Sequence, residues 1–379
     1  MRKDWEYKKL GEVAFYPNDK ISVDKIGANH YVGVENLLKD KAGILFSDQL
    51  PNAATATCFK YNDILLGNIR PYLKKIWLSN TEGGASGDVI VIRTSSDNIL
   101  PNYLFKLLSS DKFFNYFNLY TKGAKMPRGD KNAIAKFIVP TPPKPTQLAI
   151  VAELDKINEL IQLKKQQLKD YDQLAQSIFY EMFGDPVENE KGWEVKKLRE
   201  IALEKMSYGS GASAVPYNQK IRYIRITDID ELGCLKKDIV SPNICEDKYL
   251  LSDGDILFAR SGATVGKTFL FKSTYGSCIY AGYLIRLRPN TQIVIPEYVY
   301  HYTKTHYYRS FIESNQRVVA QPNINAQQYS SLKLPLPPLP LQQQFAARIE
   351  AIERQKQQVS ETIKDLETLL ASRMQYWFD

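Results

Sequence analysis

The sequence predicts an α+β fold that is built twice, as two tandem mixed α/β domains that are each followed by a long helix. Three observations lead to this prediction. The chain repeats itself internally, each copy contains β-branched runs between turn residues, and each copy ends in a long heptad-like stripe. At 379 residues, the chain is long enough for two separate cores, because single domains usually hold roughly 100–150 residues.

The internal repeat is clearest in two short boxes. Residues 5–14 (WEYKKLGEVA) return as residues 193–202 (WEVKKLREIA). A proline-rich box at residues 140–147 returns at residues 335–342, an offset of 195 positions. The same offset relates further identical pairs, which are Pro101 and Pro296, Tyr103 and Tyr298, and Phe183 and Phe378. Such spaced identities indicate a duplication.

Each copy has the same order of predicted elements. Strand-like runs occur at residues 89–93 and 284–288. Aromatic-rich helices are expected after Pro101 and Pro296, because proline suits the first position of a helix. The proline-rich box that follows can form neither a helix nor a central strand, so we expect a stiff hinge there.

Each copy ends in a predicted helix of about 38 residues, which is about 57 Å long at 1.5 Å per residue. Apolar residues alternate in steps of four and three along both helices, as they do along the contact seam of a coiled coil. The seam residues are Leu154, Ile157, Ile161, Leu168 and Ile178 in the first helix and Ile349, Ile352, Val359, Ile363 and Leu366 in the second. A single amphipathic helix on its own domain would explain one stripe, whereas two equivalent stripes favour pairing with each other.

We expect the two helices to pair as an antiparallel coiled coil, which would relate the copies by a pseudo-twofold axis. This interpretation divides the chain into a domain at residues 1–143, a helix at 144–184, a domain at 185–338 and a helix at 339–379. Two similar domains at a fixed separation suit a ligand of repeated geometry. In duplex DNA, half-sites on one face lie about 10 base pairs apart, or a multiple of that distance.

Composition narrows the function classes only partly. The net charge of +8 and the pI of about 9.0 favour a polyanionic partner, although a solvated basic surface explains them equally well. The four cysteines are scattered and form no Cys-x-x-Cys pair, so we expect neither a zinc site nor a disulfide framework, and a reducing cytoplasm. No apolar run long enough to span a membrane is present, and no apolar signal core follows the first residues.

The sequence predicts no catalytic residues, no cofactor and no metal. Residues 262–268 resemble a phosphate-binding P-loop, but three residues rather than four separate the first glycine from Gly-Lys-Thr. His301 and His306 are five positions apart and therefore do not share one helical face. Asp63 and Asp255, which each precede an apolar run, are expected to cap the turn that leads into a strand.

Several motifs together carry a family resemblance. They are Phe-Gly-Asp-Pro at residues 183–186, Lys-Gly-Trp at 191–193, the Asp-Ile-Leu strands with their loops at 63–71 and 254–262, and the proline-rich boxes that open the long helices. In this order, over essentially the whole chain, the sequence resembles the specificity subunits of type I restriction-modification enzymes. One departure is that Thr146 and Leu341 stand where the family usually has an acidic residue before the glutamine.

The resemblance implies two α+β target-recognition domains, each of which grips one half of an asymmetric bipartite site in double-stranded DNA. It also implies that the helices hold two methyltransferase subunits and that motor-nuclease subunits join the complex. Two alternatives stay open. One is a duplicated coiled-coil scaffold that binds only proteins, and the other is an enzyme that fuses recognition and chemistry in one chain.

Recognition of duplex DNA needs Lys and Arg near phosphates and Arg, Asn or Gln at base edges. In the first copy, the candidates are Arg70, Tyr72, Lys74, Lys75, Lys122, Lys125, Arg128 and Lys131. In the second copy, they are Arg225, Arg260, Ser261, Lys267, Arg317, Gln321, Asn323 and Asn325. Residues 121–130 are expected to form a flexible loop, and residues 260–267 a turn that faces phosphates. Any single one of these residues could instead be a solvated surface group.

Overall fold

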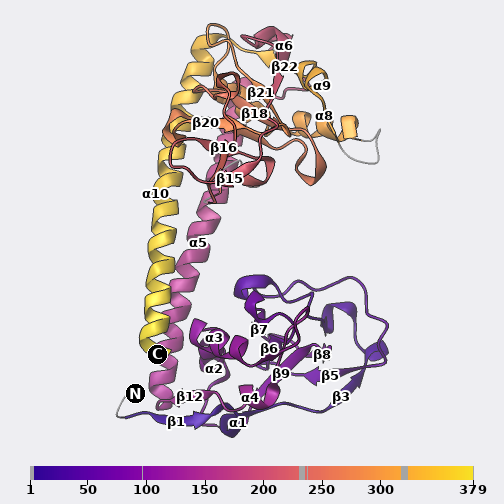
Figure 1. The fold of residues 1–379 in the computed structure, drawn as a ribbon, viewed down its shortest axis with the longest axis vertical. Coiled ribbons are helices and arrows are strands. Elements are labelled where there is room, and N and C mark those ends of the chain that lie inside the picture. Colours follow the sequence, from indigo (N-terminus) through magenta and orange to yellow (C-terminus); the bar gives the residue numbers. More distant parts are fainter. Residues whose placement is uncertain (1–3, 96, 230–234, 237, 317–322, 379) are drawn as a thin grey trace. The chain divides into compact units, whose positions relative to one another are not determined.

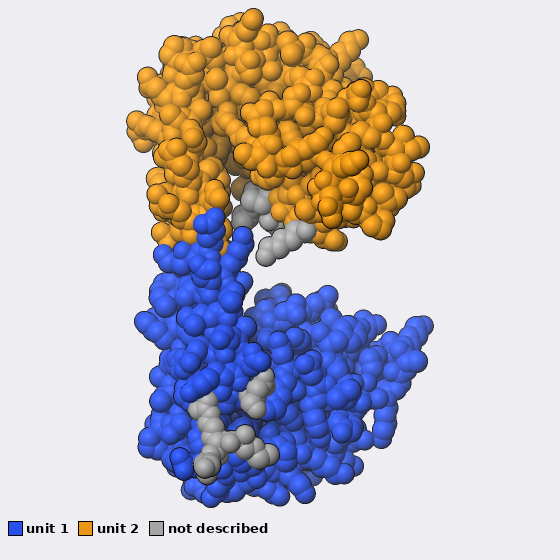
Figure 2. Space-filling view, turned by 60° about the vertical axis from the view of Figure 1, so that its left-hand side comes forward, with its two compact units in different colours: residues 1–165, 361–379 blue, residues 166–360 orange. Residues whose placement is uncertain are grey.

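The computed structural model describes residues 4–95, 97–229, 235–236, 238–316 and 323–378. The chain divides into two compact units, which Figure 2 shows in two colours. Unit 1 comprises Met1–Lys165 and Glu361–Asp379, and unit 2 comprises Gln166–Ser360. The prediction of mixed domains with long helices is confirmed, because both units contain sheets and short helices, and two 40-residue helices run through the chain.

The long helices are α5 (Lys144–Phe183) and α10 (Leu339–Phe378) (Figure 1). Each unit contains the first part of one long helix and the last part of the other. The end of α10 therefore belongs to unit 1, and the end of α5 belongs to unit 2. The two units are described separately below.

Unit 1 is built around an antiparallel sheet with the strand order β2-β9-β6-β7. Its strands are β2 (Ala14–Phe15), β6 (Ile64–Gly67), β7 (Ile76–Leu78) and β9 (Val89–Thr94). A second sheet has the order β3-β5-β8-β4, with strands β3 (Lys20–Ser22), β4 (Tyr31–Val32), β5 (Thr55–Phe59) and β8 (Gly83–Ala85). The helices are α1 (Leu10–Val13), α2 (Pro101–Leu108), α3 (Asp111–Leu119) and α4 (Lys131–Ile134).

The central sheet of unit 1 is buried on both faces because successive side chains of a strand point in opposite directions. Ile64 and Leu66 belong to the core cluster that contains Phe113 of α3. Leu65, between them, belongs to a separate cluster with Phe59 of the second sheet. Strand β6 therefore reads as a continuous apolar run rather than an alternating one.

Unit 2 repeats the central sheet with the order β14-β21-β18-β19. Its strands are β14 (Ser207–Tyr208), β18 (Ile256–Ala259), β19 (Thr268–Leu270) and β21 (Leu284–Leu287). Two separate strand pairs accompany it, β15 (Ala214–Pro216) with β17 (Val240–Pro242) and β16 (Arg222–Ile224) with β20 (Cys278–Tyr280). The short helices are α6 (Leu198–Ile201), α7 (Pro296–Tyr302), α8 (His306–Gln316) and α9 (Ala326–Ser330). The helices predicted after Pro101 and Pro296 are thus confirmed.

The prediction that the proline-rich box is a hinge is wrong. Pro140 lies in β12 (Ile138–Thr141), which pairs with β1 (Glu6–Lys9), and Pro335 lies in β22 (Lys333–Leu336), which pairs with β13 (Glu194–Lys197). Pro145 and Pro340 already belong to the first turns of α5 and α10. Proline is tolerated at both places, because a two-stranded pair leaves one edge free and a first helical turn needs no N–H donor.

A buried glutamine ties the start of each long helix to its domain. The Gln147 side chain is fully buried, and its Oε1 accepts a hydrogen bond from the backbone N–H of Leu100 at 2.9 Å. Its Nε2 donates to the carbonyls of Asn98 (2.7 Å) and Pro142 (2.8 Å). Gln342 is equally buried and makes the equivalent contacts, with the N–H of Ile295 and the carbonyls of Ile293 and Pro337.

A buried aspartate begins each central strand, as the sequence predicts. The Asp63 carboxylate accepts a hydrogen bond from the N–H of Lys60 at 2.7 Å, which caps the turn. It also forms two parallel hydrogen bonds with the Arg93 guanidinium, at 2.8 and 2.7 Å. Asp255 has the equivalent partners, which are the N–H of Ser252 and the guanidinium of Arg288. The arginine partners were not predicted.

The last turn of each long helix fills a core. Phe378 of α10 is buried in unit 1, where its ring lies 5.7 Å from that of Tyr103. Phe183 of α5 is buried in unit 2, where its ring lies 4.8 Å from that of Tyr298 and 5.2 Å from that of Phe345. Each recognition core therefore uses an aromatic residue from the helix of the other copy.

Candidate nucleic-acid interface

In unit 1, two loops that are distant in the sequence join through their backbones. The loop after β6 contains Arg70, whose N–H donates to the carbonyl of Pro127 at 2.8 Å. Ile69 and Arg128 form an isolated antiparallel bridge beside this bond. The two candidate clusters of the first copy, at residues 70–75 and 122–131, therefore form one surface.

In unit 2, the equivalent loops join in the same way. Ser261, after β18, forms an antiparallel bridge with Asn323. The backbone carbonyl of Arg260 accepts a hydrogen bond from the N–H of Ile324 at 2.9 Å. Residues 260–267 connect β18 to β19, as the predicted turn requires, and they meet the segment that leads into α9. Arg317 and Gln321 lie outside the described residues.

The predicted flexible loop at residues 121–130 contains a short hairpin instead. Strand β10 (Thr121–Lys122) pairs with β11 (Arg128–Gly129), in a register that places Lys122 opposite Arg128. Gly123 has a φ of +97°, a conformation that glycine adopts without a steric penalty. The composition of this segment suggested a loop, because two-residue strands are too short to give a periodic signal.

Six candidates of unit 1 present exposed side chains, namely Arg70, Tyr72, Lys122, Lys125, Arg128 and Lys131. Arg70 has a φ of +52°, in the left-handed region that costs a non-glycine residue roughly 1 kcal/mol or more. Gly262 takes this conformation at the equivalent turn of unit 2. An arginine at such a strained turn favours a function for its side chain.

Four candidates of unit 1 make intramolecular ion pairs or hydrogen bonds. Lys74 pairs with Asp111 at 2.7 Å, and this hydrogen bond holds the pKa of the Asp111 carboxyl below its usual range. Lys75 donates to the carbonyl of Val34, and burial lowers the pKa of its ammonium group. The remaining ion pairs are Lys122 with Asp130 and Arg128 with Asp88, each at 2.8 Å. Lys122 and Arg128 are nevertheless exposed, so their pairs can exchange for contacts with phosphate.

In unit 2, Arg260 occupies the centre of the joined loops. Its guanidinium carbon lies 4.7 Å from the ring centroid of Tyr208, and its Nε donates to Oδ1 of Asn323 at 3.3 Å. Tyr208 and Tyr283, which flank it, are 42% and 63% exposed. The sequence analysis missed both tyrosines, because only the tertiary fold brings β14 and the turn before β21 to this loop.

The remaining candidates of unit 2 have structural contacts. Asn325 caps α9, since its Oδ1 accepts from the N–H of Gln328 at 2.9 Å. Lys267 is half-buried at the start of β19. Arg225 forms a two-pronged ion pair with the buried Asp228, and this hydrogen bonding raises the pKa of the guanidinium. The Asp228 contact fixes the Arg225 side chain within its own turn.

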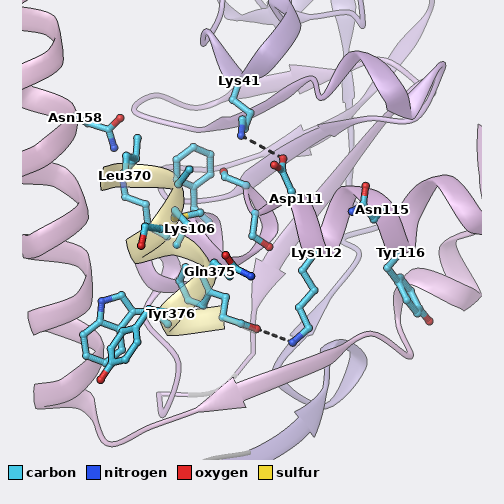
Figure 3. A pocket seen from close by; sticks show the side chains of 18 of the residues that line it. Lys41, Lys106, Asp111, Lys112, Asn115, Tyr116, Asn158, Leu370, Gln375 and Tyr376 are labelled. Carbon is cyan, nitrogen blue, oxygen red and sulfur yellow. Dashed lines mark hydrogen bonds and ion pairs between the residues drawn. The ribbon is translucent and has the colours of Figure 1, made fainter. Parts of the chain in front are cut away.

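A groove of about 1830 Å³ lies elsewhere in unit 1, between α3 and the last turns of α10 (Figure 3). Lys112 donates from its Nζ to the carbonyl of Phe378 at 2.7 Å, and Lys41 lies 3.9 Å from Asp111. The residues that line this groove include none of the candidate DNA contacts. The groove is therefore lined by other residues than the candidate contacts, although Lys74 pairs with Asp111, which lines it.

Within the described ranges, no group of three or more His, Cys, Asp or Glu side chains is arranged to hold a metal ion. Among the helices of those ranges, none combines the length and the apolar character that a membrane span requires. His301 is almost completely buried, and burial lowers the pKa of its imidazole to about 3.

The joined loops of both units offer hydrogen-bond donors, acceptors and aromatic faces, which are the groups that contact DNA.

Comparison with known families agrees with this arrangement. The chain matches the family described as "Type I restriction modification DNA specificity domain" twice, over residues 2–170 and residues 190–368. The chain belongs to this family. Because the two matches follow each other along the chain, it is a type I specificity subunit with two tandem recognition domains.

Two curated relatives of this specificity subunit come from Methanocaldococcus jannaschii. The type I restriction enzyme MjaIX specificity subunit is 24% identical, over 69% of this chain and 67% of the relative. The MjaVIII specificity subunit is 22% identical, over 97% of this chain and 92% of the relative. A chain solved in a study of complex assembly in the type I R-M system shares the fold, with a TM-score of 0.58 and 22% identity over 100% of this chain and 98% of that one.

Proposed function

We propose that this specificity subunit reads an asymmetric bipartite site in double-stranded DNA, with one half-site for each recognition domain. The first domain (residues 1–143) would use Arg70, Tyr72, Lys74, Lys75, Lys122, Lys125, Arg128 and Lys131. The second (residues 185–338) would use Arg225, Arg260, Ser261, Lys267, Arg317, Gln321, Asn323 and Asn325. The observation that carries the proposal is the joining of equivalent loops in both units, through Ile69 and Arg128 and through Ser261 and Asn323.

We further propose that the helical segments 144–184 and 339–379 pair as an antiparallel coiled coil and relate the domains by a pseudo-twofold axis. Contacts inside each unit support this. In unit 1, Glu153 near the start of α5 pairs with Arg373 near the end of α10. In unit 2, Asp172 of α5 lies 2.8 Å from Lys356 of α10. Most of the seam residues are buried, namely Leu154, Ile157, Ile161, Ile349, Ile352, Val359 and Ile363, and the others (Leu168, Ile178 and Leu366) are partly buried.

The long helices also support a second part of the proposal, the docking of two methyltransferase subunits. Large apolar side chains point to solvent on both helices, outside the seam. They are Leu148, Leu163, Leu174, Leu369 and Tyr376, which are 45–58% exposed. These side chains would give a protein partner apolar surface to contact on both helices. Motor-nuclease subunits would join through the complex, and this chain would act in the cytoplasm without a cofactor, metal or catalytic group of its own.

The experiment that tests the proposal maps methylated sites in cells that express this chain with its methyltransferase. We expect one asymmetric motif that has two halves and a fixed gap. Exchange of residues 1–143 for those of a relative should change one half and leave the other half and the gap unchanged. A continuous motif, or a change in both halves, would contradict the assignment of one half-site to each domain. Complete absence of sequence-dependent methylation would favour a scaffold that binds only proteins.

A further inference from the structure

Backbone hydrogen bonds identify which loop positions of the two domains are equivalent. In unit 1, the N–H of Asn68 donates to the carbonyl of Asp88 at 2.9 Å, and the carbonyl of Asn68 accepts from Gly129 at 3.2 Å. In unit 2, the N–H of Arg260 donates to the carbonyl of Tyr283 at 3.1 Å. The carbonyl of Arg260 accepts from Ile324 at 2.9 Å. Asn68 and Arg260 therefore occupy the same position.

The partner position across the bridge is also equivalent. Arg128 bridges Ile69, and Asn323 bridges Ser261. Arg128 and Asn323 differ by the same 195 positions as the proline-rich boxes. The first domain thus carries asparagine on the loop after the central strand and arginine on the facing segment. The second domain carries the same two residue types in exchanged places.

We propose that these two positions form the base-reading pair of each recognition domain, and that Arg128 and Arg260 each contact a guanine. This inference rests on the proposed function and names its specificity-determining residues. Arginine forms two parallel hydrogen bonds with O6 and N7 of guanine, and asparagine forms two with adenine. Among the described residues of the joined loops, no other two equivalent positions carry one arginine and one asparagine in both domains. Because the two residue types are exchanged between the domains, the order of arginine and asparagine along the joined loops would also be reversed.

Both arginines are oriented before any ligand binds. Arg260 lies over the ring of Tyr208 at 4.7 Å, and its bond to Asn323 uses Nε. A guanidinium that stacks on an aromatic face keeps its edge available, and its terminal nitrogens are the atoms that a two-pronged guanine contact requires. Arg128 is oriented differently, through a 2.8 Å hydrogen bond from its Nη2 to Asp88. Orientation in advance lowers the entropy lost when a side chain binds.

The difference between Asp88 and Tyr283 fits this arrangement. These residues occupy the same place, next to the base-reading pair. Asp88 holds the arginine of the facing segment in unit 1. In unit 2 the facing segment carries Asn323, which needs no carboxylate, and a tyrosine replaces the aspartate. A carboxylate therefore stands at this position where the facing segment carries an arginine, in unit 1, and a tyrosine stands there where the facing segment carries an asparagine, in unit 2.

The test measures methylation rates of the assembled methyltransferase complex on DNA duplexes that carry each base at every position of the motif. Arg260→Ala should lower the preference for guanine at one position of the second half-site by roughly 5- to 150-fold, the loss expected for one bidentate contact. Arg260→Gln should lose the same preference, because a glutamine amide offers one donor and one acceptor, which match adenine and not the two acceptors of guanine. Arg128→Ala should act in this way on the first half-site.

Arg199→Ala is the matched control, because Arg199 is an exposed arginine on α6 outside the joined loops. It should leave every base preference unchanged. The proposal is overturned if Arg260→Gln keeps the wild-type preference at every position, or if both Arg260 variants slow methylation equally for all bases, as the loss of a phosphate contact would. Arg260→Gln decides the question even if Arg260→Ala does not fold. Failure of the proposed function would be seen separately, as the absence of a bipartite motif for the unchanged chain.

Discussion

The two recognition domains build the same central sheet but surround it differently. The strand orders β2-β9-β6-β7 and β14-β21-β18-β19 correspond strand by strand. On the other side of this sheet, unit 1 has a four-stranded sheet, whereas unit 2 has two separate two-stranded pairs. The face that holds the short helices and the long-helix ends is therefore the repeated part, and the opposite side is where the copies diverge.

Buried polar groups show why the frame repeats so closely. Asp63 and Asp255 have equivalent partners, and so do Gln147 and Gln342. A buried polar group is costly unless all its hydrogen bonds are made, so its partners cannot change one at a time. Exposed loop positions carry no such constraint. The comparison teaches that the frame is held by a few saturated contacts, which leaves the loop chemistry free to differ.

The largest expected effect is a loss of stability that is confined to one unit at a time. Phe378→Ala should destabilise unit 1, and Phe183→Ala should destabilise unit 2, each by about 3–5 kcal/mol, because both variants leave a cavity in a packed aromatic cluster. Hydrogen exchange followed by mass spectrometry would assign each loss to a unit. Leu369→Ala and Leu174→Ala are matched controls on the same helices, since these leucines are 45% and 46% exposed. Equal loss of protection in both units for either phenylalanine variant would contradict the assignment.

A smaller effect is expected at the helix starts. Gln147→Leu and Gln342→Leu should each lower stability by about 1–3 kcal/mol, because the backbone groups that the amide satisfies are left unpaired. The two losses should be similar, since the two sets of contacts are the same. Gln343→Leu, at the exposed neighbouring position, should change stability little. Urea denaturation of each variant measures these values, and a large difference between Gln147→Leu and Gln342→Leu would show that the two helix starts are not equivalent.

Local patterns in the sequence predicted a large part of this fold. The long helices follow from a heptad stripe, and the duplication follows from spaced identities, so neither needs knowledge of distant contacts. The candidate loops were also found, because Lys, Arg, Gly and Asn gather at turns between apolar strands. The exact ends of the elements were less accessible, as the hairpin of β10 and β11 shows.

Contacts between distant residues explain what the sequence did not predict. Lys74, which stays a predicted DNA contact, pairs with Asp111, 37 residues away, and the sequence did not predict this ion pair. Tyr208 and Arg260 stack although 52 positions separate them in the sequence. No periodicity encodes such pairs, because they depend on how the strands are ordered in the sheet. The candidate surface was therefore predictable as two clusters per domain, whereas the joining of these clusters and the pair that we propose to read bases required the fold.

The smallest expected effect is a pH dependence of stability, at a position that differs between the two domains. Unit 1 carries Lys106 there, ion-paired with Asp155, whereas unit 2 carries His301, 195 positions later. Burial, with Lys304 and Lys356 nearby, lowers the pKa of His301 to about 3. As the pH falls, the imidazole is therefore protonated in the unfolded chain before it is protonated in the folded chain. The contribution of His301 to stability is complete above its unfolded pKa of about 6.5 and is lost as the pH falls towards 3, at about 1.4 kcal/mol per pH unit.

Lowering the pH from 7.5 to 5.5 should therefore destabilise unit 2 of the wild-type chain by about 1.4 kcal/mol more than in His301→Phe, in which this group cannot titrate. Denaturation curves at both pH values measure the difference. Gln343→Leu is the control, because this exposed residue of unit 2 does not titrate and its replacement should keep the wild-type pH dependence. If His301→Phe and the wild-type chain lose stability equally, the imidazole is protonated in the folded protein at pH 5.5. Unit 1, with an ion pair in place of the buried imidazole, should not share this response.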